Sequence, residues 1–290
     1  MLSYVKVILR GLSQVMLQNN ALTGLLFVSG IFLNGWPMGL GAIIGTMAST
    51  YTAKIMSYSQ PEIDGGIYGF NGALIGIAGC FFFQINLIVI VAIICGAVLS
   101  SMLMHEFKTK FPPYTLPFIL VTWIMICVLH YLHIEPQISA GLPKGNLVHI
   151  WHAVDLGFSQ VMFQENLLAG IFFFVAILVS SPLAAVYAFY GSLLGSLLET
   201  LIASTIPLIN IGLFGYNAVL CGIALGGKTR HSFVLATLAI LLSTVINFSF
   251  GKLGLVSLTF PFVVATWAAL IAFGIFKKIR TKLSVEKSKF

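Results

Sequence analysis

Three blocks of the sequence occur twice, in the same order along the chain. Residues 11–24 (GLSQVMLQNNALTG) match residues 157–170 (GFSQVMFQENLLAG) at 9 of 14 positions. At the same offset of 146, residues 66–78 match 212–224 at 7 of 13 positions, and near offset 144, residues 115–123 match 259–267 at 5 of 9. The matches include Gln, Asn, Pro and Gly, so chance similarity between apolar stretches does not explain them. The chain is predicted to contain two copies of one unit of about 145 residues.

The composition places this duplicated unit in a membrane. Only 8% of the 290 residues are charged and 59% are hydrophobic, whereas soluble domains carry about 25% charged residues. A soluble chain of this length would have too few charged side chains to cover its surface. The apolar residues form continuous runs rather than alternating with polar ones, which favours helices over a β-barrel. The fold class that we expect is an all-α polytopic membrane protein.

Each half is predicted to contain a short segment followed by five long apolar runs. The runs are 20–34, 37–57, 65–84, 87–105 and 115–133, then 166–180, 183–204, 209–226, 232–250 and 256–276. The short segments, 5–18 and 152–164, are too short and too polar to cross about 30 Å of hydrocarbon. Non-helical backbone at membrane depth is tolerated where protein or a water-filled cavity surrounds it. We therefore expect ten transmembrane helices and two re-entrant half-helices, with the half-helices at the transport pathway.

The basic residues predict the orientation of these helices. With a cytoplasmic N-terminus, thirteen of the 15 Lys and Arg residues fall on the cytoplasmic side, and only Lys144 and Lys252 fall outside. Five crossings in each half then invert the second repeat relative to the first, which places a binding site where the halves meet. The repeats are predicted to be 1–140 and 141–290, with a cytoplasmic C-terminal tail. The net charge of +7 is thus explained by topology and by attraction to anionic lipid, so no nucleic-acid partner is expected.

Ionisable residues at membrane depth are scarce, although ion transport normally requires them. Asp155 is predicted to cap the start of the second short segment, Glu165 to line a mouth or face water, and Glu199 to lie at the interface. The His130–His133 pair closes a helix and is predicted to be structural or interfacial. The four cysteines lie in apolar runs without CxxC spacing and are predicted to be small core residues, with no metal or cofactor.

The polar groups that recur in both halves are uncharged. They are Gln14 and Gln160 in the short segments, Asn71 and Asn217 in Gly-rich runs, and Thr122 and Thr266 after matched prolines. Amide and hydroxyl oxygens, with the free carbonyls at a half-helix end, suit a substrate that has several N–H donors. Nearby aromatic residues could form a slot for a flat molecule. A structural role within the helices stays open for each of these residues.

The repeated blocks resemble the urea transporter family. The resemblance rests on SQVMLQNNALTGLLF, GIYGFNGALIGIA and TLPFILVTW, each with its second copy, and covers nearly the whole chain. It implies a homotrimer with one pore in each protomer, passing urea passively down its gradient. The same resemblance implies the pore-lining positions, which are Gln14, Val15, Leu17, Phe70, Leu74 and Thr122 in the first half, and Gln160, Val161, Phe163, Tyr216, Leu220 and Thr266 in the second.

Within this resemblance, Leu17 with Phe70 and Phe163 with Tyr216 would form the two slots that sandwich the substrate. Leu17 stands where family members often have phenylalanine, Gln160 stands where some have glutamate, and Tyr216 adds a hydroxyl. These departures concern selectivity among urea analogues. A bacterial inner membrane is the location that we expect.

The sequence lacks features that three other classes of protein would be expected to have. An ammonia or ammonium channel would be expected to have histidines at the membrane centre, whereas the six histidines fall at predicted helix ends or in loops. A water or glycerol channel would be expected to have paired Asn-Pro-Ala turns. A membrane-embedded enzyme would need a carboxylate pair, a Ser/His arrangement or a metal cluster at depth, and the sequence suggests none. The sequence therefore favours a urea channel, with an ammonia or small-amide channel as the alternative.

Overall fold

A computed structural model describes residues 2–137, 147–202 and 206–287, with side chains from Tyr4 to Gly274 within these ranges. The described residues form helices joined by turns, and they pair as strands only in an isolated bridge between Phe83 and Pro136. The predicted all-α class is confirmed. The predicted repeat boundary at 140/141 and Lys144 lie outside the described residues.

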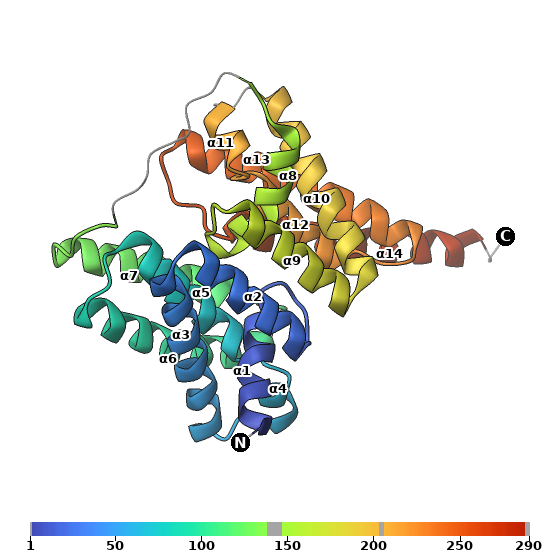
Figure 1. The fold of residues 1–290 in the computed structure, drawn as a ribbon. Coiled ribbons are helices and arrows are strands. Elements are labelled where there is room, and N and C mark those ends of the chain that lie inside the picture. The colour runs from blue at the N-terminus through green and yellow to red at the C-terminus, as the bar shows by residue number, and fades with distance from the viewer. Residues whose placement is uncertain (1, 138–146, 203–205, 288–290) are drawn as a thin grey trace.

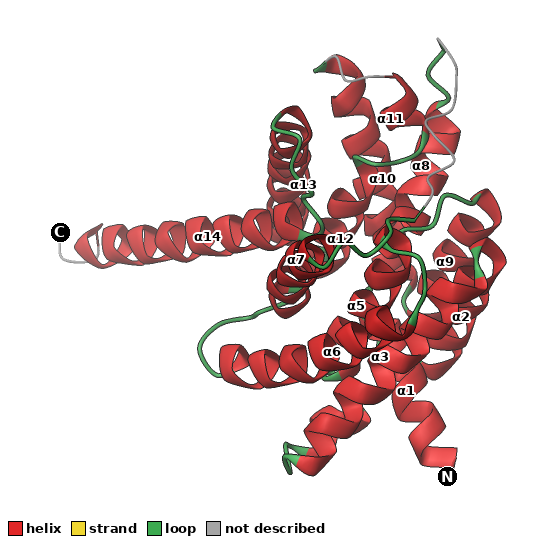
Figure 2. Ribbon diagram, turned by 90° about the vertical axis from the view of Figure 1, so that its left-hand side faces the viewer, coloured by secondary structure: helices red, strands yellow, loops and turns green. Residues whose placement is uncertain are grey.

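The helices of the two halves follow the same order (Figure 1). In the first half they are α1 (Leu2–Gln14), α2 (Ala21–Asn34), α3 (Trp36–Ile55), α4 (Gln60–Asp64), α5 (Gly69–Phe82), α6 (Leu87–Lys108) and α7 (Leu116–Tyr131). In the second they are α8 (Ile150–Ser159) with the 3-10 turn η1 (Gln160–Met162), α9 (Leu167–Ser180), α10 (Pro182–Leu201), α11 (Ile206–Asn210), α12 (Gly215–Leu225), α13 (Arg230–Lys252) and α14 (Phe260–Lys287). The last helix, α14, extends away from the rest of the molecule (Figures 1 and 2).

The short segments and the runs that follow them form sharply bent pairs. α1 meets α2 at 74°, and α8 with η1 meets α9 at 77°, with a break of at most four residues in each pair. Within the described ranges, α6, α10 and α13 are each long and apolar enough to cross a membrane alone. The number of such spans is five if each bent pair counts as one. The ten crossings expected from the sequence stay a prediction.

Two predicted runs contain shorter helices than expected, because each begins with a turn. Residues 65–68 and 211–214 precede α5 and α12, and Gly66 and Gly212 there have φ of 77° and 73°. A Cβ on Gly66 would lie 2.4 Å from the backbone nitrogen of Gly11. Glycine therefore allows both the left-handed backbone and the close approach to α1.

Helices α3 and α5 approach each other backbone to backbone. A Cβ on Gly76 would lie 1.8 Å from the carbonyl oxygen of Gly41, and one on Gly45 would lie 2.0 Å from that of Gly72. Small residues at the contact allow this approach, as is typical of helix pairs in membranes. In the second half, Gly191 of α10 lies close to Ala218 of α12 in the same way.

The two halves meet through pairs of equivalent residues. Trp123 donates its indole N–H to the Val256 carbonyl at 2.9 Å, and Trp267, its equivalent, donates to the Pro112 carbonyl at 2.8 Å. Trp267 lies 144 residues after Trp123, and Val256 lies 144 residues after Pro112. Each half therefore donates the same hydrogen bond to the other half. The hydroxyls of Thr115 and Thr259 lie 2.7 Å apart, and the rings of Phe27 and Phe173 are 5.1 Å apart. Reciprocal contacts between equivalent residues are what a two-fold relation between copies produces.

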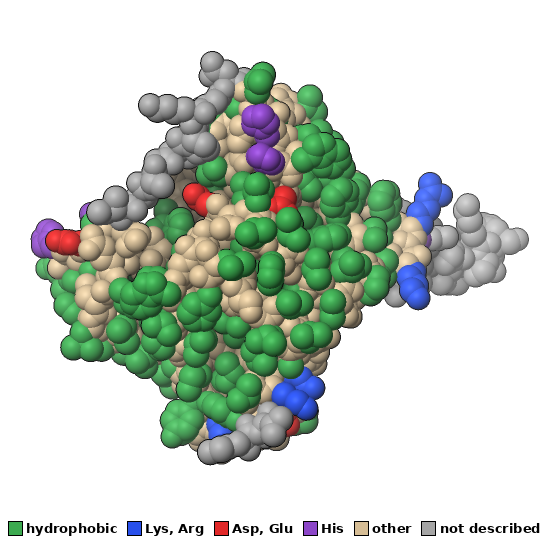
Figure 3. Space-filling view, viewed as in Figure 1, with side chains coloured by type: hydrophobic (Ala, Val, Ile, Leu, Met, Phe, Trp, Pro, Cys, Tyr) green, Lys and Arg blue, Asp and Glu red, His purple; other side chains and the backbone are tan. Residues whose placement is uncertain are grey.

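Hydrophobic side chains cover most of the face drawn in Figure 3, while Lys and Arg lie at its lower and right-hand edges. Two of the four cysteines are exposed at the surface of the protein. Cys80 and Cys221 are buried as predicted, but Cys95 and Cys127 are exposed, and all four are free. The prediction that all are core residues is therefore wrong for two of them, because an apolar run in a membrane protein has a lipid-facing side as well as a core-facing side.

Candidate functional site

Each half-helix ends in the same tight turn. Ser13 lies in the last turn of α1, and its hydroxyl is 2.9 Å from the Arg10 carbonyl oxygen and 2.5 Å from the Gln18 carbonyl oxygen, so that it can donate to either. Ser159 makes the equivalent bonds in the second half, to Leu156 at 3.1 Å and Gln164 at 2.7 Å. These hydroxyls fold the chain back on itself, so that the half-helix ends inside the protein.

The residue that closes each turn has a left-handed backbone. Leu17 has φ of 57° and Phe163 has φ of 59°, a backbone conformation that residues other than glycine adopt rarely. Asn20 and Asn166 then cap α2 and α9 with their side-chain oxygens. The turn therefore presents residue 17 or 163 at the same place in both halves.

The two glutamines hold the half-helices against the glycine turns. The Gln14 amide donates to the Gly65 carbonyl at 2.9 Å, and the Gln160 amide donates to the Ile211 carbonyl at 3.1 Å. Both side chains are buried, with exposed fractions of 8% and 6%. Each amide keeps its carbonyl oxygen as an acceptor, so Gln14 and Gln160 position α5 and α12 and still offer an oxygen.

The asparagines have a structural role. Asn71 accepts the backbone N–H of Phe118 at 3.1 Å, and Asn217 accepts that of Phe262 at the same distance. These N–H groups belong to the first turns of α7 and α14, where a helix has no internal acceptor for them. For Asn71 and Asn217 the structure supports the structural interpretation that the sequence left open.

The two threonines are buried and differ in their partners. Thr122 and Thr266 both have an exposed fraction of 0%. The Thr266 hydroxyl lies 3.8 Å from the Cys221 sulfur, whereas the Thr122 hydroxyl has no hydrogen-bond partner among the described residues. An unpaired buried hydroxyl costs free energy unless something else supplies its partner.

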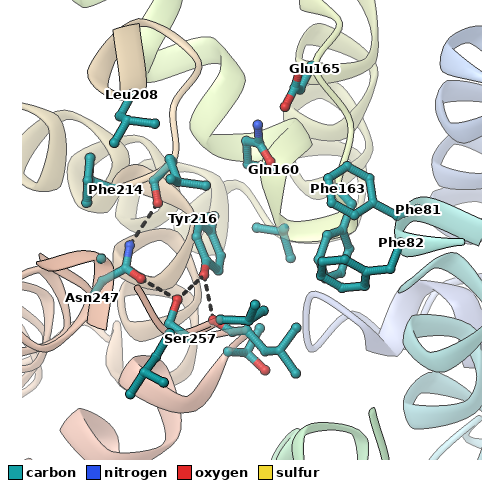
Figure 4. A pocket seen from close by; sticks show the side chains of 17 residues that line it. Phe81, Phe82, Gln160, Phe163, Glu165, Leu208, Phe214, Tyr216, Asn247 and Ser257 are labelled. Atoms are coloured by element: carbon teal, nitrogen blue, oxygen red, sulfur yellow. Dashed lines mark hydrogen bonds between the residues drawn. The ribbon is translucent and has the colours of Figure 1, made fainter. Parts of the chain in front are cut away.

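One cavity of about 210 Å³, the α8 cavity, lies beside the end of the second half-helix (Figure 4). Phe81, Phe82 and Phe163 stand on one side of it, and Tyr216 and the loop of Ser257 stand on the other. The Tyr216 hydroxyl donates to the Leu258 carbonyl at 2.5 Å and lies 3.1 Å from the Ser257 hydroxyl. The cavity is thus lined mostly by apolar side chains, and hydrogen-bonded groups stand on the side that faces the three rings.

The structure brings four of the twelve predicted pore residues to the α8 cavity. They are Gln160, Val161, Phe163 and Tyr216. Eight do not line it, namely Gln14, Val15, Leu17, Phe70, Leu74, Thr122, Leu220 and Thr266, and all of these are buried except Leu17, which is partly buried. In the part of the chain that is described, no aromatic pair joins Phe163 to Tyr216, whereas Phe163 lies 5.0 Å from Phe81.

Several cavity residues were not predicted from the sequence. Phe81 and Phe82 come from the first half, and Asn247, Phe214 and Ser257 from loops and helices of the second. The signal for the first two was the run of three phenylalanines at the end of the Gly-rich helix, where the second repeat has Gly227 and Lys228. Glu165 is exposed and lines the cavity, as one of the two predicted roles requires.

Two acidic residues differ from the prediction. Asp155 does not cap a helix, because α8 begins at Ile150 and Asp155 lies within it, with Oδ2 unpartnered among the described residues. Glu199 is not interfacial, because its exposed fraction is 0% and neither carboxylate oxygen has a described partner. The apolar run predicts the helix that carries Glu199 but does not show which side of that helix packs against neighbouring helices.

A charged cluster occupies the equivalent end of the first half. Lys108 pairs with Glu62, and the Tyr68 hydroxyl lies 3.1 Å from Glu62 and 3.2 Å from His105. Partial burial raises the pKa of Glu62, but the hydrogen bonds from Lys108 and Tyr68 outweigh it and hold the pKa below its ordinary value. At offset 146, Leu208 and Phe214 replace Glu62 and Tyr68, so the two ends are chemically different.

Comparisons with known proteins identify sequences that are similar to this chain. A family model described as urea transporter matches residues 5–274. Urea transporter 1 of Capra hircus is 29% identical over 299 residues, covering 93% of this chain and 77% of the goat protein. Urea transporter 1 of Ovis aries has the same identity and coverage over 301 residues. Urea transporter 1 of Rattus norvegicus is 31% identical over 245 residues, which is 78% of this chain and 64% of the rat protein.

Proposed function

The chain belongs to the urea transporter family, and from that premise we propose that it is a channel through which urea moves passively down its gradient. Members of this family are membrane transporters and not enzymes. The proposed pore runs between two inverted repeats, at 1–140 and 141–290, and passes the ends of both half-helices. In this proposal the two repeats together contain ten transmembrane crossings and two half-helices, with five crossings and one half-helix in each repeat and both termini in the cytoplasm.

The observation that carries this proposal is the burial of the two half-helix ends. Gln14 and Gln160 would face lipid if the duplicated segments were peripheral, but both side chains are enclosed and bonded to the turns before α5 and α12. Irregular backbone at membrane depth is stable only beside protein or a cavity. The α8 cavity lies beside one of these two ends. The reciprocal Trp123 and Trp267 contacts support the two-fold relation that inverted repeats require.

The proposed mechanism replaces water with protein acceptors. Urea would donate its N–H groups in turn to the glutamine oxygens, half-helix carbonyls and threonine hydroxyls, while its faces rest on apolar or aromatic side chains. Each hydrogen bond that is lost without replacement costs about 1–3 kcal/mol, so the series of acceptors must be nearly continuous. The Thr122 hydroxyl, buried and unpartnered in the described structure, is suited to such a contact. Ions would be excluded because the apolar flanks cannot replace their hydration.

The first test removes the central hydroxyls. We expect Thr122→Val with Thr266→Val to lower urea permeability by about tenfold, because Val keeps the shape of Thr but cannot bond to the permeant. Stopped-flow light scattering of proteoliposomes measures this at equal protein content. Thr122→Ser with Thr266→Ser keeps both hydroxyls and is the matched control. Permeability equal to wild type in the valine variant would refute the role of the threonines.

The same preparation separates the alternatives. Swelling with urea, ammonia and acetamide as permeants ranks the urea channel against an ammonia or small-amide channel, and glycerol reports a less selective pore. We propose a homotrimer with one pore in each protomer, in a bacterial inner membrane. Cross-linking in native membranes tests the trimer, and a dimer or monomer would contradict it.

A further inference from the structure

We propose that Phe81 and Phe82 are specificity-determining residues of the α8 cavity, which forms the mouth of the proposed pore in the second half (the second-half mouth). Together with Phe163 they form a three-ring wall that excludes permeants bulkier than urea. This inference rests on the proposed channel function and concerns the selectivity of the same pathway. Phe81 and Phe82 belong to the first half, although the other residues that line this mouth belong to the second half.

The wall exists because α5 is longer than its equivalent. α12 ends at Leu225, which is equivalent to Gly79, whereas α5 continues for three more residues to Phe82. The added turn carries Phe81 and Phe82 beyond the end of the repeat pattern and toward the other half. At offset 146 their equivalents are Gly227 and Lys228. The first-half mouth therefore receives no ring from the second half at this position.

The three rings contact one another in a fixed geometry. Phe81 lies 5.0 Å from Phe163 with the planes at 44°, and Phe82 lies 6.0 Å from Phe163 at 74°. Phe81 and Phe82 are themselves 5.1 Å apart at 84°. Behind them, Phe118 of α7 lies 6.4 Å from Phe163 in an edge-on arrangement. Edge-to-face ring contacts of this kind contribute about 0.5–1.5 kcal/mol each beyond simple burial, so the wall resists displacement.

The three-ring wall faces a side of the cavity that holds both polar and apolar groups. Figure 4 shows Phe81, Phe82 and Phe163 opposite Tyr216, with Gln160 between them. A solute in the cavity of about 210 Å³ therefore meets the three rings on one side, and on the other side it meets Tyr216 together with apolar side chains such as Leu208 and Phe214. A phenylalanine ring has only two side-chain torsions and cannot fold aside as readily as a longer flexible chain. Methyl groups added to a permeant would bring it into closer contact with these rings, whereas urea itself is small and flat.

The first-half mouth lacks these features. Leu17, the equivalent of Phe163, is aliphatic, and the charged cluster of Glu62 and Lys108 lies at that end. An aliphatic side chain with more rotamers yields more easily to a bulkier solute. Exclusion by bulk is therefore assigned to the second-half mouth alone.

The experiment compares permeability ratios rather than rates. Proteoliposomes that contain the full chain are challenged with urea, N-methylurea and N,N′-dimethylurea by stopped-flow light scattering. We expect Phe81→Leu with Phe82→Leu to raise the ratio of dimethylurea to urea permeability by about fivefold or more, since one methyl group at a fitted surface changes selectivity by about tenfold or more. Phe32→Leu is the matched control, because Phe32 is 40% exposed on α2 and lies outside the cavity, so its ratio should equal that of wild type.

Each result decides the proposal. An unchanged ratio in the double variant overturns the ring wall, even if urea still passes. If the double variant fails to fold, Phe81→Leu and Phe82→Leu are measured as single variants. The permeability ratio of the wild-type protein supplies a separate check. In wild type, dimethylurea should permeate at less than about one tenth of the urea rate, and equal rates would overturn the wall. Absence of urea flux in wild type above that of empty liposomes would instead refute the channel function.

Discussion

At the scale of single residues, equivalent positions have kept their places in the fold while their chemistry has diverged. Gln14 and Gln160 bind equivalent carbonyls, at positions 65 and 211. Glu62 and Leu208 are also equivalent, but one carries an ion pair and the other lines a cavity. The backbone of the repeat determines where these side chains lie. Because the residues at equivalent positions differ, the charge and polarity at the corresponding ends of the two halves differ as well.

The Glu62–Lys108 pair predicts a pH effect on stability. The folded pKa of Glu62 is below its ordinary value of 4.5, so its contribution is present at neutral pH and is lost as the pH falls through the folded pKa. The pair is partly exposed, and we expect its loss to cost less than about 1 kcal/mol. Glu62→Gln should lower the thermal midpoint at pH 7 but have no effect once the pH is well below 4.

Thermal unfolding in detergent between pH 7 and 3 measures this difference. Glu135→Gln is the control, because Glu135 is exposed and makes no ion pair in the described part of the chain. A constant difference between Glu62→Gln and wild type across the whole pH range would contradict the assignment.

At the scale of elements, the close contact between α3 and α5 determines where α5 lies in the first half. Glycines at 41, 45, 72 and 76 bring the two backbones together, and α5 carries Phe70 and Leu74 on the same helix. Close packing of this kind tolerates no added carbon, because a neighbouring carbonyl oxygen occupies the space.

We expect Gly76→Ala to destabilise the protein by about 1–3 kcal/mol or to prevent its folding, since its Cβ would lie 1.8 Å from the Gly41 carbonyl oxygen. Size-exclusion profiles and thermal midpoints in detergent report the loss. Gly251→Ala is the matched control, because nothing lies within 4 Å of a Cβ at that position of α13. A Gly76→Ala protein as stable as wild type would show that α3 and α5 separate without cost.

At the scale of the whole molecule, the two halves are held together by contacts that occur twice. Because Trp123 and Trp267 make the same bond to the opposite half, Trp123→Phe and Trp267→Phe should each lower stability by about 1 kcal/mol. The two losses should be equal and additive in the double variant, since the two bonds share no partner. Trp36→Phe, at a side chain that is 59% exposed, should change little. Thermal unfolding measures all four proteins, and unequal losses would contradict the two-fold relation.

The sequence by itself determined the helical class, the duplicated order of elements and the family, because these depend on local apolar runs and on motifs that each repeat carries. The resemblance to the family also predicted Gln160, Val161, Phe163 and Tyr216 as pore residues, and in the structure these four line one cavity, while their role in a pore stays a prediction. Only the tertiary structure decided that Phe81 and Phe82 reach that cavity, that Glu199 is buried and that Cys95 and Cys127 are exposed. Those outcomes depend on which side of a helix meets which distant segment. An apolar run records no such choice, because in a membrane its lipid-facing and core-facing sides are both hydrophobic.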